Sequence, residues 1–120
     1  MDLQLKNKVA VITGPAKGMG RAVTLAFAEH GARLVLAGRD TAAIEPVAAE
    51  ARALGVPAIV VPCDLTQAAQ TEALARQALE AYGHIDILVN VAGGSGPIGK
   101  TGWETSTEEF NEIVELNMTG

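Results

Sequence analysis

Four short apolar runs, separated by longer alanine-rich stretches, constrain the fold of this chain more than any other feature of its sequence. Each run is rich in Val, Ile or Leu, is too short for a helix and is bounded by Gly, Pro or Asp. These properties are typical of strands buried on both faces of a parallel sheet. The alternation predicts βαβ units, and therefore an α/β, doubly wound parallel sheet with strand order 3-2-1-4 and helices on both faces. The strands are expected at Val9–Thr13, Arg33–Ala37, Ala58–Pro62 and Ile87–Val91.

The stretches that follow the strands have the periodicity of amphipathic helices. A glycine that suits a left-handed C-terminal cap follows each of the first three, at Gly31, Gly55 and Gly83. Thr66 is the expected N-cap of the third helix, and Asp40 that of the second. The helices are expected at Met19–His30, from Asp40 or Thr41 to Leu54, at Thr66–Tyr82, and from Ser106 or Thr107 onward through Val114.

The fourth helix is predicted because Ser106 and Glu109 have capping-box spacing and apolar residues follow at helical intervals. Asn117 falls seven residues after Phe110 and so extends the apolar stripe of this helix. A core-facing amide needs hydrogen-bond partners. Asn117 is therefore either a satisfied structural residue or a functional one.

The segment Thr13–Gly20 joins the first strand to the first helix and has the properties of a dinucleotide phosphate site. Gly14 can make the tight turn off the strand, Gly18 lets backbone N–H groups approach a pyrophosphate, and Gly20 lets the helix pack closely on the strand. The helix N-terminus adds unsatisfied donors and a positive dipole end. Glycines that serve only a turn are the alternative, but the flanking strand and helix favour the phosphate site of a Rossmann-like fold.

The spacing Gly-x-x-x-Gly-x-Gly after Thr13 resembles that of the short-chain dehydrogenase/reductase family. Further matches fall at corresponding places and span nearly the whole chain. Val91 stands where the family usually has a second Asn, which affects only the polar role of that side chain. The matching segments are Cys63-Asp64-Leu65 after the third strand, Asn90-Val91-Ala92-Gly93 after the fourth, and Leu116-Asn117-Met118 in the fourth helix.

The resemblance implies that the chain is the N-terminal, cofactor-binding half of an oxidoreductase that interconverts an alcohol and a carbonyl by hydride transfer. It implies that Asp64 and Leu65 hold the adenine and that residues 90–93 line the adenosine ribose. It also implies that Asn117 belongs to the catalytic site, where it helps to hold a water or proton path beside the catalytic lysine. The alternatives are that Asp64 only helps to cap the third helix and that Asn90 only satisfies loop backbone.

The residues after the second strand predict the cofactor type. An acid about 20 residues past the glycines would bind the ribose 2′-hydroxyl of NAD, whereas Arg would suit the 2′-phosphate of NADP. Gly38 occupies the acidic position here, Arg39 follows it, and Lys17 adds a second cation. NADP-preferring members of the family carry basic residues at these two places. Asp40 is the competing residue, an acid that could favour NAD(H), but it is interpreted as a helix N-cap. We therefore expect NADP(H) to be preferred over NAD(H). The expected cofactor-binding residues are Thr13, Gly14, Lys17, Gly18, Met19, Gly20, Arg39, Asp64, Leu65, Asn90, Ala92 and Gly93.

The composition excludes several classes of function. A formal net charge of -5 argues against nucleic acid as the main partner, because phosphate backbones are bound by clustered Lys and Arg. No apolar run approaches the roughly 18 to 20 residues of a membrane span, and the N-terminus lacks the pattern of a signal peptide. Cys63, the single cysteine, has no metal-ligand spacing to His30 or His84. We expect a metal-free cytoplasmic protein with a small-molecule partner, and a homo-oligomer at full length.

A rival pattern, the P-loop consensus G-x-x-x-x-G-K-[ST], occurs at Gly94–Thr101. The next helix signal comes too late to aim N–H donors at a phosphate there, and no Walker B strand ending in Asp is evident. The dehydrogenase interpretation is therefore favoured, with a non-catalytic nucleotide-binding or scaffold module as the second hypothesis.

The catalytic Tyr-x-x-x-Lys pair of the family has no match in the sequence, since the single tyrosine, Tyr82, has no Lys four residues on. The chain is therefore expected to form one domain over residues 1–120, truncated before the catalytic half and inactive alone. Its fourth strand, Ile87–Val91, would be an uncovered edge unless more chain or a partner covered it.

Overall fold

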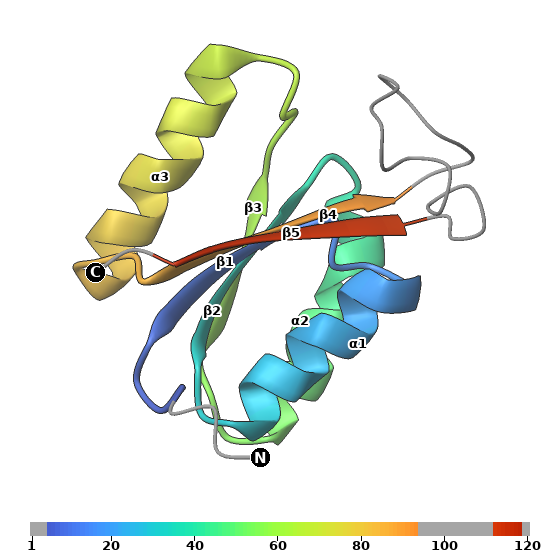
Figure 1. Ribbon diagram of the computed structural model, residues 1–120, viewed down its shortest axis with the longest axis vertical. Helices are drawn as coiled ribbons and strands as arrows, with labels where there is room; N and C mark the ends of the chain where they lie inside the picture. Colours follow the sequence, from blue (N-terminus) through green and yellow to red (C-terminus); the bar gives the residue numbers. More distant parts are fainter. Residues whose placement is uncertain (1–4, 94–111, 119–120) are drawn as a thin grey trace.

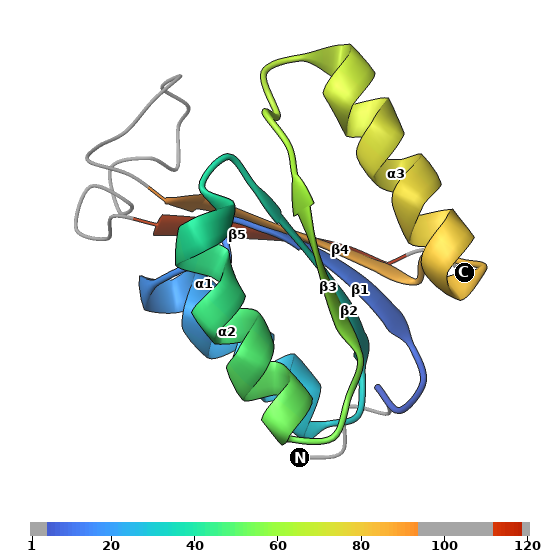
Figure 2. The ribbon, with the colours of Figure 1, turned by 180° about the vertical axis from the view of Figure 1, so that it is seen from behind.

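The structure, a computed structural model, describes residues 5–93 and 112–118 of the 120-residue chain. A sheet runs through the middle, with α1 and α2 on one face and α3 on the other (Figures 1 and 2). The elements are β1 (Val9–Thr13), α1 (Gly18–Glu29), β2 (Arg33–Gly38), α2 (Thr41–Ala53), β3 (Ala58–Pro62), α3 (Ala68–Tyr82), β4 (Ile87–Gly93) and β5 (Glu112–Met118).

The strand order is β3-β2-β1-β4-β5. The first four strands are parallel, with β1 at their centre, where Val11 pairs with Val35 of β2 on one side and Leu88 of β4 on the other. The predicted doubly wound sheet with order 3-2-1-4 is therefore confirmed. Parallel strands with helices on both faces place their four carboxyl ends at one edge, and that edge is where ligands bind in such sheets.

The predicted fourth helix is wrong over Glu112–Met118, which forms β5, antiparallel to β4. The expected uncovered edge at Ile87–Val91 is wrong for the same reason, because β5 pairs along it. Val114, Leu116 and Met118 alternate at strand spacing, so the segment satisfies the period of a strand as well as that of a helix. The unpaired backbone groups along β4 offer it a hydrogen-bonding partner, and tertiary pairing overrides the local helical pattern. Residues 106–111 lie outside the described part of the chain.

Helix ends follow the expected chemistry in all but one case. Asp40 caps α2 by accepting the N–H of Ala43 at 3.1 Å, as predicted. The prediction of Thr66 as N-cap of α3 is wrong: the cap is Gln67, which makes no side-chain capping bond. Thr66 instead donates its N–H and hydroxyl to Asp64, at 3.0 and 2.7 Å, so it is part of the turn that precedes the helix.

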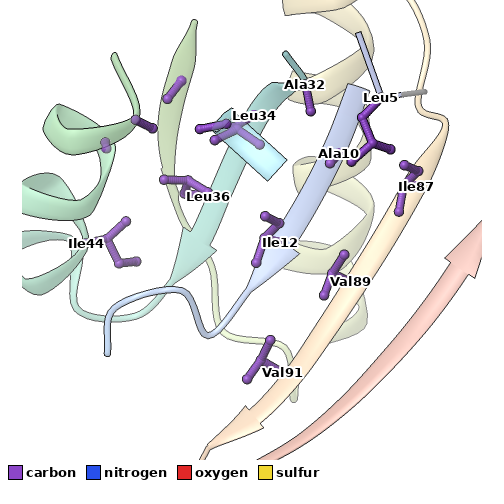
Figure 3. Packing of buried hydrophobic residues seen from close by; sticks show 14 residues of the cluster. Leu5, Ala10, Ile12, Ala32, Leu34, Leu36, Ile44, Ile87, Val89 and Val91 are labelled. Carbon is purple, nitrogen blue, oxygen red and sulfur yellow. The ribbon is translucent and has the colours of Figure 1, made fainter. Parts of the chain in front are cut away.

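The core consists of two apolar clusters, one on each face of the sheet, because successive strand residues point to opposite faces. On one face Ile12, Leu36 and Val89 pack with Ile44 of α2 (Figure 3). On the other face the cluster is smaller and contains side chains of the strands and of α3. Its buried members are Val11, Val35, Ala37, Val61, Cys63, Leu74 and Ala78. Both faces of the sheet are thus covered, which holds the strand ends in a fixed relation.

Candidate functional site

The strand register brings the predicted site segments to a single edge of the sheet. Thr13 pairs with Ala37 on β2 and with Asn90 on β4, and Gly38 pairs with Pro62 on β3. The glycine loop, Arg39, Asp64 and the end of β4 therefore leave the sheet side by side. The sequence placed each of these segments after a strand, and the structure confirms that they meet.

Two glycines of the loop are required by close backbone approach. A Cβ on Gly14, whose φ is +70°, would lie 2.3 Å from the carbonyl oxygen of Val91. A Cβ on Gly20 would lie 1.8 Å from the carbonyl oxygen of Gly14. Both distances are far inside van der Waals contact, so no other residue fits without moving the backbone. The loop is thereby pressed against β4 on one side and against the first turn of α1 on the other.

The N-terminus of α1 faces outward at this edge. Lys17 is its N-cap and makes no side-chain capping bond, and the first turn contains no acidic residue. Lys17, Gly18 and Met19 are exposed. Within the first turn, therefore, neither the N-cap side chain nor a carboxylate competes for the positive dipole end of the helix, and this end suits an anion.

Thr13 links the glycine loop to β4. Its side chain is buried, with 2% of its surface exposed, and its hydroxyl donates to Oδ1 of Asn90 at 2.5 Å. The amide NH₂ of Asn90, an exposed residue, is left as a donor at the edge of the sheet. The alternative in which Asn90 only satisfies loop backbone does not describe this bond, which is between two side chains.

Asp64 organises the turn between β3 and α3. Its Oδ1 accepts both donors of Thr66, and its Oδ2 lies 3.5 Å from Nε2 of Gln67. The pKa of this carboxyl is lowered, mainly by the bonds from Thr66 and also by the positive charge of Arg39. Leu65, the next residue, exposes 45% of its surface. Asp64 thus forms the turn that precedes α3, whereas the sequence offered helix capping as its alternative role and the N-cap is Gln67. Asp64 still retains acceptor capacity on Oδ2.

The two predicted cations are exposed, and neither forms an ion pair with another residue in 5–93. Arg39 follows β2 and is close enough to Asp64 to lower its pKa. Lys17 lies in the glycine loop. Positive charge therefore follows both β1 and β2 at the carboxyl edge of the sheet.

Other predicted residues are placed by their backbone alone. Ala92 and Gly93 end β4 at the same edge as the glycine loop. Asn117 lies on β5 opposite Leu88, two residues along β4 from Asn90 and toward the amino end. The register thus places Asn117 away from the strand ends where the other predicted residues meet. Gly94–Thr101, the rival P-loop pattern, lies outside the described residues.

Sequence reasoning missed Gln70, whose Oε1 accepts the backbone N–H of Asp64 at 2.7 Å. Its position was a usable signal, since a glutamine three residues after the Gln67 N-cap has the spacing that lets a side chain reach back to backbone N–H groups. Gln70 also accepts the thiol of Cys63 on its carbonyl oxygen, at 3.7 Å, and burial raises the pKa of that thiol.

Two absences hold for residues 5–93 and 112–118. None of their helices has the length and apolar character needed to cross a membrane. No cluster of three or more His, Cys, Asp or Glu side chains among them could hold a metal ion.

Comparison with known proteins identifies relatives of the whole chain. The family model for short chain dehydrogenase matches residues 8–120. An uncharacterized oxidoreductase of Mycobacterium tuberculosis is 41% identical over 115 residues, covering 96% of this chain and 43% of that protein. The 7alpha-hydroxysteroid dehydrogenase of Escherichia coli K12 is 36% identical over 117 residues, covering 98% and 45%. The chain spans less than half the length of these relatives.

Solved structures agree in fold. A metagenomic short-chain oxidoreductase in complex with NADP is 37% identical with a TM-score of 0.67, over 70% of this chain and 38% of that one. A short chain dehydrogenase/reductase from Burkholderia phymatum in complex with NAD is 35% identical with a TM-score of 0.69, over 88% and 39%. The two neighbours thus bind different nicotinamide dinucleotides.

Proposed function

The chain belongs to the short-chain dehydrogenase family, and we propose that it supplies the cofactor site of an NADP-preferring oxidoreductase that interconverts an alcohol and a carbonyl. The cofactor, when bound, supplies the hydride chemistry. This chain's own residues bind and orient it. Since the chain spans less than half of its relatives, the substrate pocket and the complete reaction belong to the intact protein.

The observation that carries the proposal is the close packing of Gly14 and Gly20 at the N-terminus of α1. The absence of any Cβ allows the loop to lie flat against its own helix, so that a pyrophosphate can reach the backbone donors. A loop with side chains at these positions would hold the phosphates away from the helix end. The helix dipole would then contribute little, because its effect falls off within the first turn.

The preference for NADP rests on charge. Gly38, at the end of β2, has no carboxylate with which to bind a ribose 2′-hydroxyl, and a Cβ there would lie 2.9 Å from Cδ1 of Ile44. Arg39 and Lys17 are exposed cations without an ion-pair partner among residues 5–93. In the proposed site both would neutralise a 2′-phosphate, and Arg would do so with a forked donor pair.

The other strand ends would bind the adenosine. We assign the adenine to Oδ2 of Asp64 and the apolar surface of Leu65, and the adenosine ribose to residues 90–93. Asn90 has its NH₂ group available for this role because its oxygen is occupied by Thr13. The catalytic role of Asn117 stays a prediction from the resemblance.

Tyr82 does not take part in this chemistry. Its hydroxyl donates to the carbonyl oxygen of Leu34 at 3.0 Å, near the amino end of β2, far along the strand from the glycine loop. The proton-transfer groups would thus come from the remainder of the intact protein.

Titration of the intact protein with NADPH and with NADH tests the proposal. We expect both to bind, with NADPH showing the lower Kd. An NADH Kd as low as that of NADPH would refute the roles of Arg39 and Lys17. Failure of both nucleotides to bind would refute the cofactor site itself.

A further inference from the structure

We infer that Gln70 is a positioning residue for the adenine end of the proposed cofactor site, and that it acts by holding Asp64 so that Oδ2 can accept a hydrogen bond from the adenine amino group. This inference rests on the proposed function. It adds a residue of α3 that touches no cofactor and that determines how well the site distinguishes adenine from other bases.

Gln70 holds the turn from two sides. Its side-chain Oε1 accepts the N–H of Asp64 at 2.7 Å, and its main-chain oxygen accepts the thiol of Cys63 at 3.7 Å. Because Gln70 is in the first turn of α3, the position of the turn is tied to a helix that packs on the sheet. The short bond to the backbone N–H fixes where the Cα of Asp64 lies, and hence where its carboxylate begins.

The two carboxylate oxygens of Asp64 have different hydrogen-bond partners. Oδ1 is occupied by the N–H and the hydroxyl of Thr66, at 3.0 and 2.7 Å. Among the side chains of residues 5–91, Oδ2 has one hydrogen-bond partner, Nε2 of Gln67 at 3.5 Å, which is the outer limit of a hydrogen bond. Gln67 is itself held by Nε2 of Gln70, which donates to its Oε1 at 3.2 Å. Oδ2 is therefore the oxygen available to a ligand. Gln70 bonds both the backbone N–H of Asp64 and the side chain of Gln67, which lies beside Oδ2.

A fixed acceptor gives specificity for an amino group. Adenine presents an exocyclic NH₂ donor, whereas hypoxanthine presents a carbonyl oxygen at the same position, which cannot donate to a carboxylate. A site built to make a given hydrogen bond discriminates against an analogue that cannot make it. If the turn around Asp64 loosens, the carboxylate can move away from either base, and the discrimination falls.

The test compares Kd values of NADPH and of its hypoxanthine analogue for the intact protein. We expect the wild type to bind NADPH about threefold to tenfold more tightly than the analogue, the range of one hydrogen bond. Gln70→Met, which keeps length but accepts no bond from the Asp64 N–H, should lose most of that ratio. Gln70→Glu keeps the acceptor for the Asp64 N–H but loses the donor to Gln67, and it should retain the larger part of the ratio. Gln77→Met, at an exposed position of the same helix, is the matched control and should equal the wild type.

The ratio of the two Kd values distinguishes a specific role of Gln70 from a general effect on folding. It also distinguishes failure of this inference from failure of the proposed function. A wild-type ratio retained by Gln70→Met would overturn the role of Gln70. Should Gln70→Met fail to fold in thermal unfolding, Gln70→Asn, whose amide is one methylene too short, provides the same comparison with the same outcomes. A wild type that binds NADPH and its analogue equally would overturn the inference while the cofactor site stands. A wild type that binds neither NADPH nor NADH would refute the proposed function instead.

Discussion

The two ends of the parallel sheet differ in their exposed charge: Lys17 and Arg39 lie at the carboxyl end, whereas long-range side-chain bonds to strand backbone lie at the amino end. At the amino end polar side chains bond the protein's own backbone: Oδ2 of Asp86 accepts the N–H of Val9 at 2.8 Å, and the hydroxyl of Tyr82 donates to Leu34. The guanidinium of Arg52 likewise donates to the carbonyl oxygen of the first residue of β3. At the carboxyl end Lys17 and Arg39 are exposed and form no ion pair within residues 5–93.

This contrast separates stability from binding. Polar groups that satisfy buried or edge backbone stabilise the fold, since an unsatisfied partner costs about 1 to 3 kcal/mol. Exposed cations contribute little to stability and remain available to a ligand. Substitutions at the amino end should therefore lower the free energy of unfolding and leave cofactor affinity unchanged. Substitutions of the exposed cations should do the reverse.

The largest effect is expected for Gly20→Ala. This substitution should lower both stability and cofactor affinity, because the glycine loop contributes to both. The new Cβ would lie 1.8 Å from the Gly14 carbonyl oxygen, so the loop must move away from α1. We expect about 1 to 3 kcal/mol less stability from overpacking, and NADPH affinity lower by about a hundredfold or more. Denaturant unfolding and NADPH titration measure the two effects.

Gly55→Ala is the control for that substitution. Gly55 also has a positive φ, +99°, but a Cβ there would meet nothing within 4 Å. It should cost about 1 to 2 kcal/mol of stability through backbone strain and leave NADPH binding unchanged. Equal NADPH affinity for Gly20→Ala and Gly55→Ala would contradict the account of the loop.

Arg39→Ala should lower cofactor affinity with little effect on stability. Loss of a charge-assisted bond to the 2′-phosphate is expected to weaken NADPH binding by about tenfold to a hundredfold. NADH, which has no 2′-phosphate, should be affected much less. The free energy of unfolding should change by less than about 0.5 kcal/mol, as for most exposed positions. A parallel loss of NADH affinity would show that Arg39 acts on the fold of the loop and not on the phosphate.

Asp86→Ala, at the amino end of the sheet, should lower stability and leave cofactor affinity unchanged. The substitution removes the acceptor of the Val9 N–H and an ion pair with His84. We expect the free energy of unfolding to fall by about 1 to 3 kcal/mol, because a buried donor at the start of β1 loses its partner. The NADPH Kd of the folded variant should match the wild type. A tenfold weaker Kd would mean that the two ends of the sheet are coupled.

Tyr82→Phe is expected to have the smallest effect, about 0.5 to 1.5 kcal/mol, the usual contribution of one hydrogen bond. Burial raises the pKa of Tyr82 above its ordinary value, so the folded state disfavours the phenolate. The stability from the neutral phenol is complete below the unfolded pKa of about 10 and is lost as pH rises through the folded pKa. Denaturation curves at about pH 9 and about pH 11 should show a smaller alkaline loss for Tyr82→Phe than for the wild type.

Local sequence pattern was enough for much of the fold. The bounds of Val9–Thr13 and Ala58–Pro62 agree with prediction, because short apolar runs bounded by breakers have few other structures available. The glycine caps were also predictable: Gly31, Gly55 and Gly83 all have positive φ, which other residues adopt only with strain.

The features that could not be predicted from the sequence depend on contacts between residues distant in the chain, or on where a helix begins. Glu112–Met118 suits a helix by one period and a strand by another, and only the unpaired edge of β4 decides between them. The bond between Thr13 and Asn90 joins residues 77 positions apart. The bond from Asp64 to Gln70 depends on where α3 begins, and the predicted Thr66 cap placed that start too early.

The most direct test of the central claim is backbone amide hydrogen exchange of the intact protein, residue by residue, with and without NADPH. We predict increased protection at residues 14, 16–20, 38–40 and 64–66, at the carboxyl ends of the strands. We predict no change at residues 6–8 and 84–87, at the amino ends. Protection at the amino ends, or none at residues 14 and 16–20, would contradict the assignment of the carboxyl edge as the cofactor site.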